Sequence, residues 1–145
     1  MEEFDHIDFM KNVKNALILA KDQAGCRLLQ KWLDQKDPYV TTLIFDQILP
    51  HFPELIIDPF GNYLCQKLAE SCSYHQFTQL LKSISKTLKH ICNNPYGTRA
   101  VQKLFELVNN DEKVTILTEN LRNDVVSLVK VLFFNFWLNL FISIK

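Results

Sequence analysis

Glycine is scarce in this chain, which has only three glycines among its 145 residues. Because flexible linkers are rich in glycine and serine, this scarcity argues against several domains joined by tethers. No low-complexity tract occurs, and hydrophobic residues make up 48% of the sequence. That apolar content is enough for one domain with a core of its own.

The chain also lacks an excess of charge of either sign. Sixteen lysines and arginines balance sixteen acidic residues, and the sequence pI is about 6.9. A protein that holds nucleic acid through a strong basic field, without regard to sequence, is therefore not expected. A protein that holds nucleic acid mainly through its bases remains compatible with this neutrality.

Metal-binding and catalytic patterns are missing as well. The four cysteines form no Cys-x-x-Cys pair, no histidine has zinc-ligand spacing, and His51, His75 and His90 lack phased Asp or Cys partners. We therefore expect no metal, no cofactor and no enzymatic activity. The acidic start of the chain, residues 1–6, does not resemble a secretory signal, and unpaired cysteines suit a reduced intracellular protein.

One short motif occurs three times at a constant spacing. Its copies are Gly25-Cys26-Arg27-Leu28-Leu29-Gln30-Lys31, Gly61-Asn62-Tyr63-Leu64-Cys65-Gln66-Lys67 and Gly97-Thr98-Arg99-Ala100-Val101-Gln102-Lys103. Both the glycines and the glutamines are 36 residues apart. A fixed period of this length is typical of a repeat protein.

Each glycine follows a turn and starts a helix, which we call the motif helix. Asp58-Pro59 and Asn94-Pro95 precede two of the glycines and predict the turns. The first and fifth residues after the glycine are four apart, so they share a helix face, and the second residue flanks that face. We expect these three residues, here called the trio, to point outward, and the third and fourth to point into a core.

The chemistry of the trio suits the recognition of nucleobases. The fifth residue is always glutamine, whose amide both donates and accepts hydrogen bonds. The first residue is small or short, and the second is a flat arginine or tyrosine that can stack on a base. One such set in each unit predicts a module that recognises one base per repeat.

Over residues 9–130 this arrangement resembles the PUF (Pumilio) family of RNA-binding proteins. In that family, Cys or Ser with Arg and Gln goes with adenine, and Asn with Tyr and Gln goes with uracil. The resemblance therefore implies that Cys26/Arg27/Gln30 recognise A, Asn62/Tyr63/Gln66 recognise U and Thr98/Arg99/Gln102 recognise A. Because the family binds RNA antiparallel, the implied segment is 5′-AUA-3′, and the A, U, A order suggests the first three of eight repeats.

The resemblance also implies a fold class and a biological role. The fold is an all-α, right-handed α-solenoid of about three complete repeats and one truncated repeat, with the motif helices on the concave face. The role is post-transcriptional regulation of messenger RNA through its 3′ untranslated region, in the cytoplasm, with effector proteins on the convex face. The alternative is a helical-repeat scaffold that binds protein, like HEAT or armadillo arrays.

The expected units are residues 9–36, 40–72 and 76–109, with a partial unit at 112–130. Phase is lost near Val131, and residues 131–145 form a hydrophobic segment without a trio. This segment is too short for a membrane-spanning helix of about 20 residues. It remains open whether it is an anchor, a cap for the last unit or sequence foreign to the repeats. Lys31, Lys67 and Lys103 also leave two alternatives, phosphate contact or a solvated helix face.

Overall fold

The computed structural model describes residues 5–107, and every regular element among them is helical. This confirms the predicted all-α fold. Three units follow one another, and each consists of a leading helix, a 3₁₀ turn, a short helix and a motif helix. The helices are α1 (His6–Asn12), α2 (Ala16–Ala20), α3 (Gln23–Leu33), α4 (Pro38–Ile48), α5 (Phe52–Leu55), α6 (Gly61–Ser71), α7 (Tyr74–Ile84), α8 (Leu88–Cys92) and α9 (Pro95–Glu106).

The leading element of each unit is divided, which the sequence pattern did not predict. The 3₁₀ turns Val13–Asn15, Leu49–His51 and Ser85–Thr87 separate a longer helix from a short one. In the second unit Pro50 lies in the turn, and Pro53 lies in the first turn of α5, where its missing N–H costs no helical hydrogen bond. As a result, a separate short helix precedes each motif helix.

Acidic or amide side chains cap the start of each motif helix. The side chains of Asp22, Asp58 and Asn94 accept hydrogen bonds from the backbone N–H of Gly25, Gly61 and Gly97, at 2.8, 2.7 and 3.0 Å. These contacts satisfy N–H groups that have no partner within the helix. Asp22 and Asn94 are the N-cap residues of α3 and α9, whereas Asp58 lies two residues before Phe60, the N-cap residue of α6.

The glycines allow each motif helix to lie against the short helix before it. A Cβ atom at Gly97 would stand 2.2 Å from the backbone oxygen of Ile91, and one at Gly25 would stand 2.6 Å from that of Leu19. No side chain fits at such distances. The fixed glycine thus reflects a close approach of two backbones rather than a special backbone angle.

The three units share one continuous core. It contains all five buried apolar residues of the third and fourth motif positions, whereas Leu28 is only partly buried. Phe9 and Trp32 meet edge to face in the first unit, with ring centroids 4.9 Å apart. Because neighbouring units complete each other's core, the array is held together by stacking of units, as in other repeat proteins.

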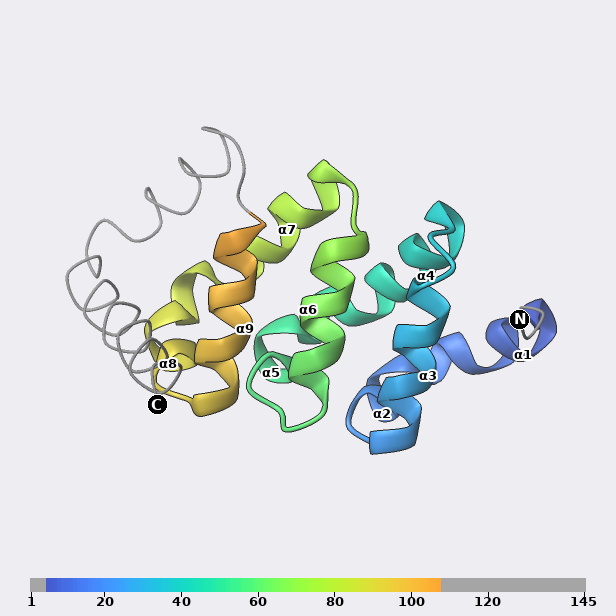
Figure 1. Ribbon diagram of the computed structural model, residues 1–145, viewed down its shortest axis with the longest axis horizontal. Helices are drawn as coiled ribbons and strands as arrows, with labels where there is room; N and C mark the ends of the chain where they lie inside the picture. Colours follow the sequence, from blue (N-terminus) through green and yellow to red (C-terminus); the bar gives the residue numbers. More distant parts are fainter. Residues whose placement is uncertain (1–4, 108–145) are drawn as a thin grey trace, which may run out of the picture.

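Figure 1 shows α3, α6 and α9 side by side in one layer, with the other helices of the second and third units behind them. The trios therefore lie on one face of a solenoid. Within residues 5–107, no helix is long and apolar enough to cross a membrane. The predicted partial unit at 112–130 and the hydrophobic segment at 131–145 lie outside the described residues.

Candidate functional site

The flat residues of the three trios project from the face that the motif helices form. Arg27, Tyr63 and Arg99 are all exposed, and the side chain of Tyr63 keeps 45% of its surface accessible. The guanidinium of Arg99 donates to the Tyr63 hydroxyl at 3.5 Å, and the two residues are 36 positions apart, which is one repeat period. Neighbouring flat groups thus lie close enough to share one ligand between them.

An open pocket of about 500 Å³ lies between the first two motif helices. The complete first trio, Cys26, Arg27 and Gln30, lines one side of it, and Tyr63 of the second trio lines the other. Polar edges, a cation and an aromatic ring therefore surround one space. A flat, polar heterocycle matches that set of groups, because it has an edge for hydrogen bonds and two faces for stacking.

The first residue of each trio does not point outward, so that expectation is wrong. Cys26, Asn62 and Thr98 keep only 3%, 1% and 8% of their surface accessible. Their side chains turn back toward the turns that precede motif helices, where backbone carbonyls need donors. The first position therefore forms the inner wall of the site, the glutamines are partly buried, and the residues of the second position are exposed.

In the second repeat the first and fifth residues are joined. The Asn62 amide donates to the carbonyls of Asp58 and Pro59 at 2.7 and 3.0 Å, and the Gln66 amide donates to Asn62 Oδ1 at 3.3 Å. Both donors of the Asn62 amide are thus used within its own turn, and its oxygen accepts from Gln66. The chain of contacts fixes the orientation of Gln66 on the exposed face.

The first repeat has an equivalent chain that reaches into its neighbour. Gln30 Nε2 approaches Cys26 Sγ at 3.2 Å, and the Cys26 thiol donates to the carbonyl of Phe60 at 3.1 Å. Burial raises the pKa of the Cys26 thiol above its ordinary value, although the contact with Gln30 opposes the rise. The protonated thiol therefore persists at neutral pH as a donor from the first repeat to the second.

The third repeat departs from this arrangement. The Thr98 hydroxyl donates to the carbonyl of Cys92 at 2.5 Å. Within the described part of the chain, no hydrogen bond joins Thr98 to Gln102. The Gln102 amide is consequently less constrained than those of Gln30 and Gln66.

Ion pairs between repeats lie next to the trios. Lys67 pairs with Asp34 of the preceding repeat, and Lys103 pairs with Glu70 at 3.0 Å. The Glu70 carboxylate raises the pKa of Lys103 above its ordinary value. In the free chain both ammonium groups are thus paired with carboxylates of the preceding repeat while they stay partly exposed, and contact with phosphate stays a prediction.

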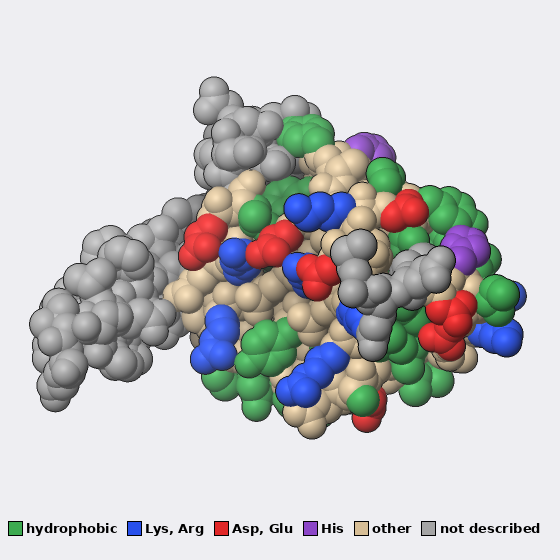
Figure 2. Space-filling model, turned by 45° about the vertical axis from the view of Figure 1, so that its right-hand side comes forward, with side chains coloured by type: hydrophobic (Ala, Val, Ile, Leu, Met, Phe, Trp, Pro, Cys, Tyr) green, Lys and Arg blue, Asp and Glu red, His purple; other side chains and the backbone are tan. Residues whose placement is uncertain are grey.

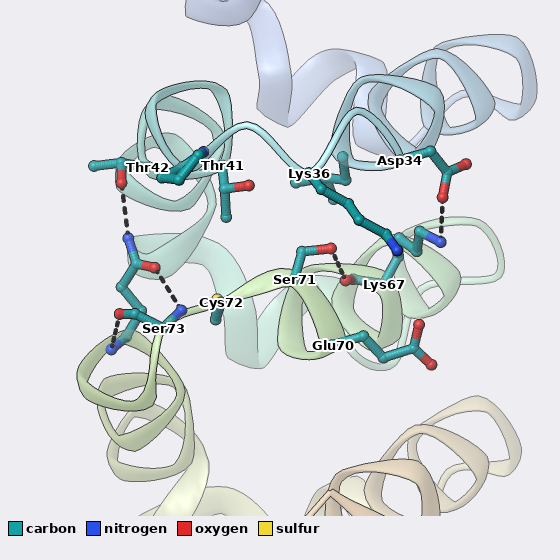
Figure 3. Close-up of a pocket in the computed structure, with 12 residues that line it drawn as sticks. Asp34, Lys36, Thr41, Thr42, Lys67, Glu70, Ser71, Cys72 and Ser73 are labelled. Atoms are coloured by element: carbon teal, nitrogen blue, oxygen red, sulfur yellow. Dashed lines mark hydrogen bonds and ion pairs between the residues drawn. The ribbon is translucent and has the colours of Figure 1, made fainter.

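A second pocket, of about 540 Å³, opens at the other end of the first two motif helices. Figure 3 shows the Asp34–Lys67 pair at its rim and Thr41 and Thr42 on the α4 side. None of the nine trio residues lines this pocket. It is therefore separate from the candidate base site.

Some residues around the site were not predicted from the sequence. Gln23, Pro59 and Phe60 line the first pocket with the trio, because the turn before each motif helix faces the preceding repeat. A signal existed, since an aromatic residue precedes the glycine in the second and third copies, as Phe60 and Tyr96. Another signal was the acid nine residues after each glycine, at Asp34, Glu70 and Glu106.

The base pocket is lined by one charged side chain, Arg27, and the surrounding surface carries charges of both signs. Figure 2 shows acidic and basic side chains interspersed on the same face. Among residues 5–107, no group of three His, Cys, Asp or Glu side chains is placed to hold a metal ion. The fold and the site together define a helical-repeat protein that presents one polar, stacking site per repeat.

Comparison with known proteins identifies the repeat. The model of the Pumilio-family RNA binding repeat matches residues 15–49, 51–85 and 89–119. Pumilio homolog 12 of Arabidopsis thaliana is 43% identical over 115 residues, which cover 77% of this chain and 19% of the relative. Suppressor protein MPT5 of Saccharomyces cerevisiae is 39% identical over 115 residues, which cover 78% of this chain and 13% of the relative.

Solved structures agree with this result. The Puf4 RNA binding domain bound to an HO endonuclease 3′ UTR recognition sequence superposes with a TM-score of 0.72 and 44% identity, covering 77% of this chain and 35% of that one. The RNA-binding domain of yeast Puf5p bound to MFA2 RNA gives a TM-score of 0.70 and 38% identity, covering 74% and 30%. This chain belongs to the Pumilio family, which is a family of RNA-binding repeats and not of enzymes.

The chain spans only a part of these relatives. It covers about a fifth or less of the two curated proteins and about a third of the solved domains. The matched segments also have a different phase from the units expected at 9–36, 40–72 and 76–109, since each begins near the short helix. In a continuous solenoid the choice of starting point is a convention, and both divisions contain the same three trios.

Proposed function

We propose that this chain binds single-stranded RNA in a sequence-specific manner and that its three repeats take the consecutive bases 5′-AUA-3′. Gln30 and Cys26 recognise the 3′ adenine, Gln66 and Asn62 the uracil, and Gln102 with Thr98 the 5′ adenine. Arg27, Tyr63 and Arg99 stack on these bases. The target is a messenger 3′ untranslated region, and the role is regulation of translation or stability in the cytoplasm.

The observation that carries this proposal is the pocket between the first two motif helices. It brings the edge-binding groups Cys26 and Gln30 together with two stacking groups, Arg27 and Tyr63, from adjacent repeats. A base that enters this space can form hydrogen bonds on its edge while its faces are covered. The family membership adds that solved relatives hold RNA with the same kind of repeat.

Binding by three repeats alone is expected to be weak. Stacking contributes about 1–3 kcal/mol per base, so three bases supply roughly 3–9 kcal/mol. Association itself costs about 4–15 kcal/mol. A short AUA oligonucleotide should therefore bind with a dissociation constant well above the micromolar range.

The decisive experiment changes the middle base. The double variant Asn62→Ser, Gln66→Glu should move the preference from U toward G, because a carboxylate accepts from the N1–H and N2–H donors of guanine. A competition among four RNAs that differ only at that base measures the change. Gln47→Glu, an exposed substitution on α4, is the matched control and should keep U preferred. If the double variant also keeps U, the second trio does not contact a base.

We further propose that the RNA-binding unit ends near residue 130 and that residues 131–145 do not contribute to it. Removal of 131–145 should leave the AUA preference intact and improve solubility, because that segment is rich in aromatic and aliphatic residues. Loss of helical structure in the shortened chain would instead identify the segment as a cap. Membrane association of the full chain alone would identify it as an anchor.

A further inference from the structure

The inter-repeat ion pairs recur with the same period as the trios. Acidic residues follow the glycines by nine positions, and lysines follow them by six. The acid of one repeat pairs with the lysine of the next in both cases that the structure describes, Asp34–Lys67 and Glu70–Lys103. Such a regular pattern at two successive interfaces points to a shared role.

Helical geometry places these pairs directly beside the base sites. Asp34 follows Gln30 by four residues, so it continues the line of the first and fifth trio positions by about one turn, or about 6 Å along the helix axis. Lys67 follows Tyr63 by four residues and continues the line of the stacking residues in the same way. Each pair therefore joins the same two motif helices that enclose a base site, one turn farther along.

Local helix stability does not explain the position of the acids. Asp34 is the C-terminal cap of α3, and Glu70 and Glu106 lie in the last turns of α6 and α9. The negative end of a helix dipole lies there, so an acidic side chain is unfavourable at this end, whereas a lysine is favourable. A gain in stability is also small for such pairs, because Lys67 and Asp34 keep 30% and 56% of their side chains exposed.

We propose that Asp34 and Glu70 mask Lys67 and Lys103 from the phosphates of bound RNA, so that affinity depends on the bases. This inference rests on the proposed RNA binding. An RNA phosphate near the base site must compete with a carboxylate already on the ammonium group, and the exchange of one anion for another gains little. Without the acid, the lysine would hold any RNA and weaken the dependence on sequence.

The two pairs should differ in strength of masking. Lys103 lies 3.9 Å from Glu106 in addition to its contact with Glu70, whereas Asp34 is the acid that pairs with Lys67. Removal of Asp34 therefore frees its lysine, but removal of Glu70 leaves Lys103 beside a second carboxylate. The effect of Asp34→Asn should exceed that of Glu70→Gln.

The test measures RNA affinity of the full chain as a function of salt concentration. Asp34→Asn should raise affinity for an AUA-containing RNA and for one with all three bases changed by the same factor, about twofold to fivefold near 50 mM salt. The slope of log K against log salt should steepen by about 0.7, the value for one additional phosphate contact with a single strand. Adding Lys67→Gln to Asp34→Asn should abolish both changes.

Asp46→Asn is the matched control, because it makes the same change of charge at an exposed position on α4, which is not a motif helix. An equal gain in this control would show an effect of net charge and overturn the masking role. If Asp34→Asn binds RNA more weakly and unfolds at a lower denaturant concentration, the ion pair stabilises the fold and does not mask Lys67. If the wild-type chain prefers AUA but Asp34→Asn binds no better, the masking proposal is wrong and the proposed function stands. If the wild-type chain binds no RNA, the proposed function is wrong and masking falls with it.

Discussion

The second and third repeats carry the same motif, but their side chains are bonded in different ways. In the second, Asn62 is anchored to the carbonyls of its own turn and holds Gln66. In the third, Thr98 bonds the carbonyl of Cys92, and its trio glutamine is not part of that contact. The first trio position is therefore a structural anchor as well as a candidate base contact, and its residue type decides how firmly the glutamine is oriented.

The largest difference between the two repeats should appear when the glycine is enlarged. At Gly97 a Cβ would meet the backbone oxygen of Ile91 at 2.2 Å, whereas at Gly61 the nearest atoms are 2.9 Å away and include the side-chain tip of Leu55. Gly97→Ala should cost about 3 kcal/mol of unfolding free energy and Gly61→Ala about 1–2, since the backbone oxygen of Leu55 is 2.9 Å from a Cβ at Gly61 and has to move less than that of Ile91. Urea titrations followed by circular dichroism measure both. Equal costs would mean that the third unit relaxes as readily as the second.

The anchor of the third repeat is the next test. Thr98→Val keeps the shape of the side chain but leaves the Cys92 carbonyl without its donor, which should cost about 2 kcal/mol of unfolding free energy. The third site should still prefer A, because the hydroxyl is already bonded to Cys92 and Thr98 meets the base only through its shape, which valine keeps. Thr98→Ser, which restores the donor, should recover most of the stability. A variant Thr98→Val that changes the preferred base would show that the hydroxyl turns toward RNA.

Most of the fold followed from the sequence, because the period of 36 residues places each motif helix, although α3 and α9 begin two residues before the glycines that were expected to start them. The glycines, the caps Asp58 and Asn94 and the apolar positions each carry a local signal. The divided leading helices did not follow, because the 3₁₀ turn Ser85–Thr87 contains neither proline nor glycine. Its position depends on packing between units, which a single repeat does not encode.

The site was predicted in part for a similar reason. Spacing alone groups Cys26 with Gln30 and Asn62 with Gln66, and the structure joins both pairs. Spacing cannot show that the first residue of each pair turns inward, because this depends on carbonyl groups such as that of Phe60 in the next repeat. The wall that Pro59 and Phe60 add to the pocket is likewise visible only once two repeats are stacked.

A smaller effect should separate the two glutamines. Gln102→Ala should remove about 1 kcal/mol of discrimination between bases at the third site, since the Thr98 hydroxyl is already bonded elsewhere. Gln66→Ala should lose less at the second site, because it frees Asn62 Oδ1 to accept a hydrogen bond from the base. Binding competition with RNAs changed at one base measures each loss. Greater loss for Gln66→Ala would indicate that Asn62 acts only as an anchor.

The smallest effect concerns pH and sets the thiol anchor of the first repeat against the hydroxyl anchor of the third. Burial raises the pKa of Cys26 in the folded chain, so the unfolded chain loses this proton first as pH increases. The contribution of Cys26 to stability is therefore complete below about pH 9, its ordinary pKa, and is lost as pH rises through the higher folded value.

Cys26→Ser replaces the titrating thiol donor with a hydroxyl donor that does not titrate, like that of Thr98. The unfolding free energy of this variant should fall less between pH 8 and pH 10 than that of the wild type. Burial also raises the pKa of Cys72 to about 12 and that of Cys92 to about 11, but both remain in the variant and cancel in the comparison. Identical pH dependence in the two proteins would mean that the Cys26 thiol contributes no proton-linked stability between the first two repeats.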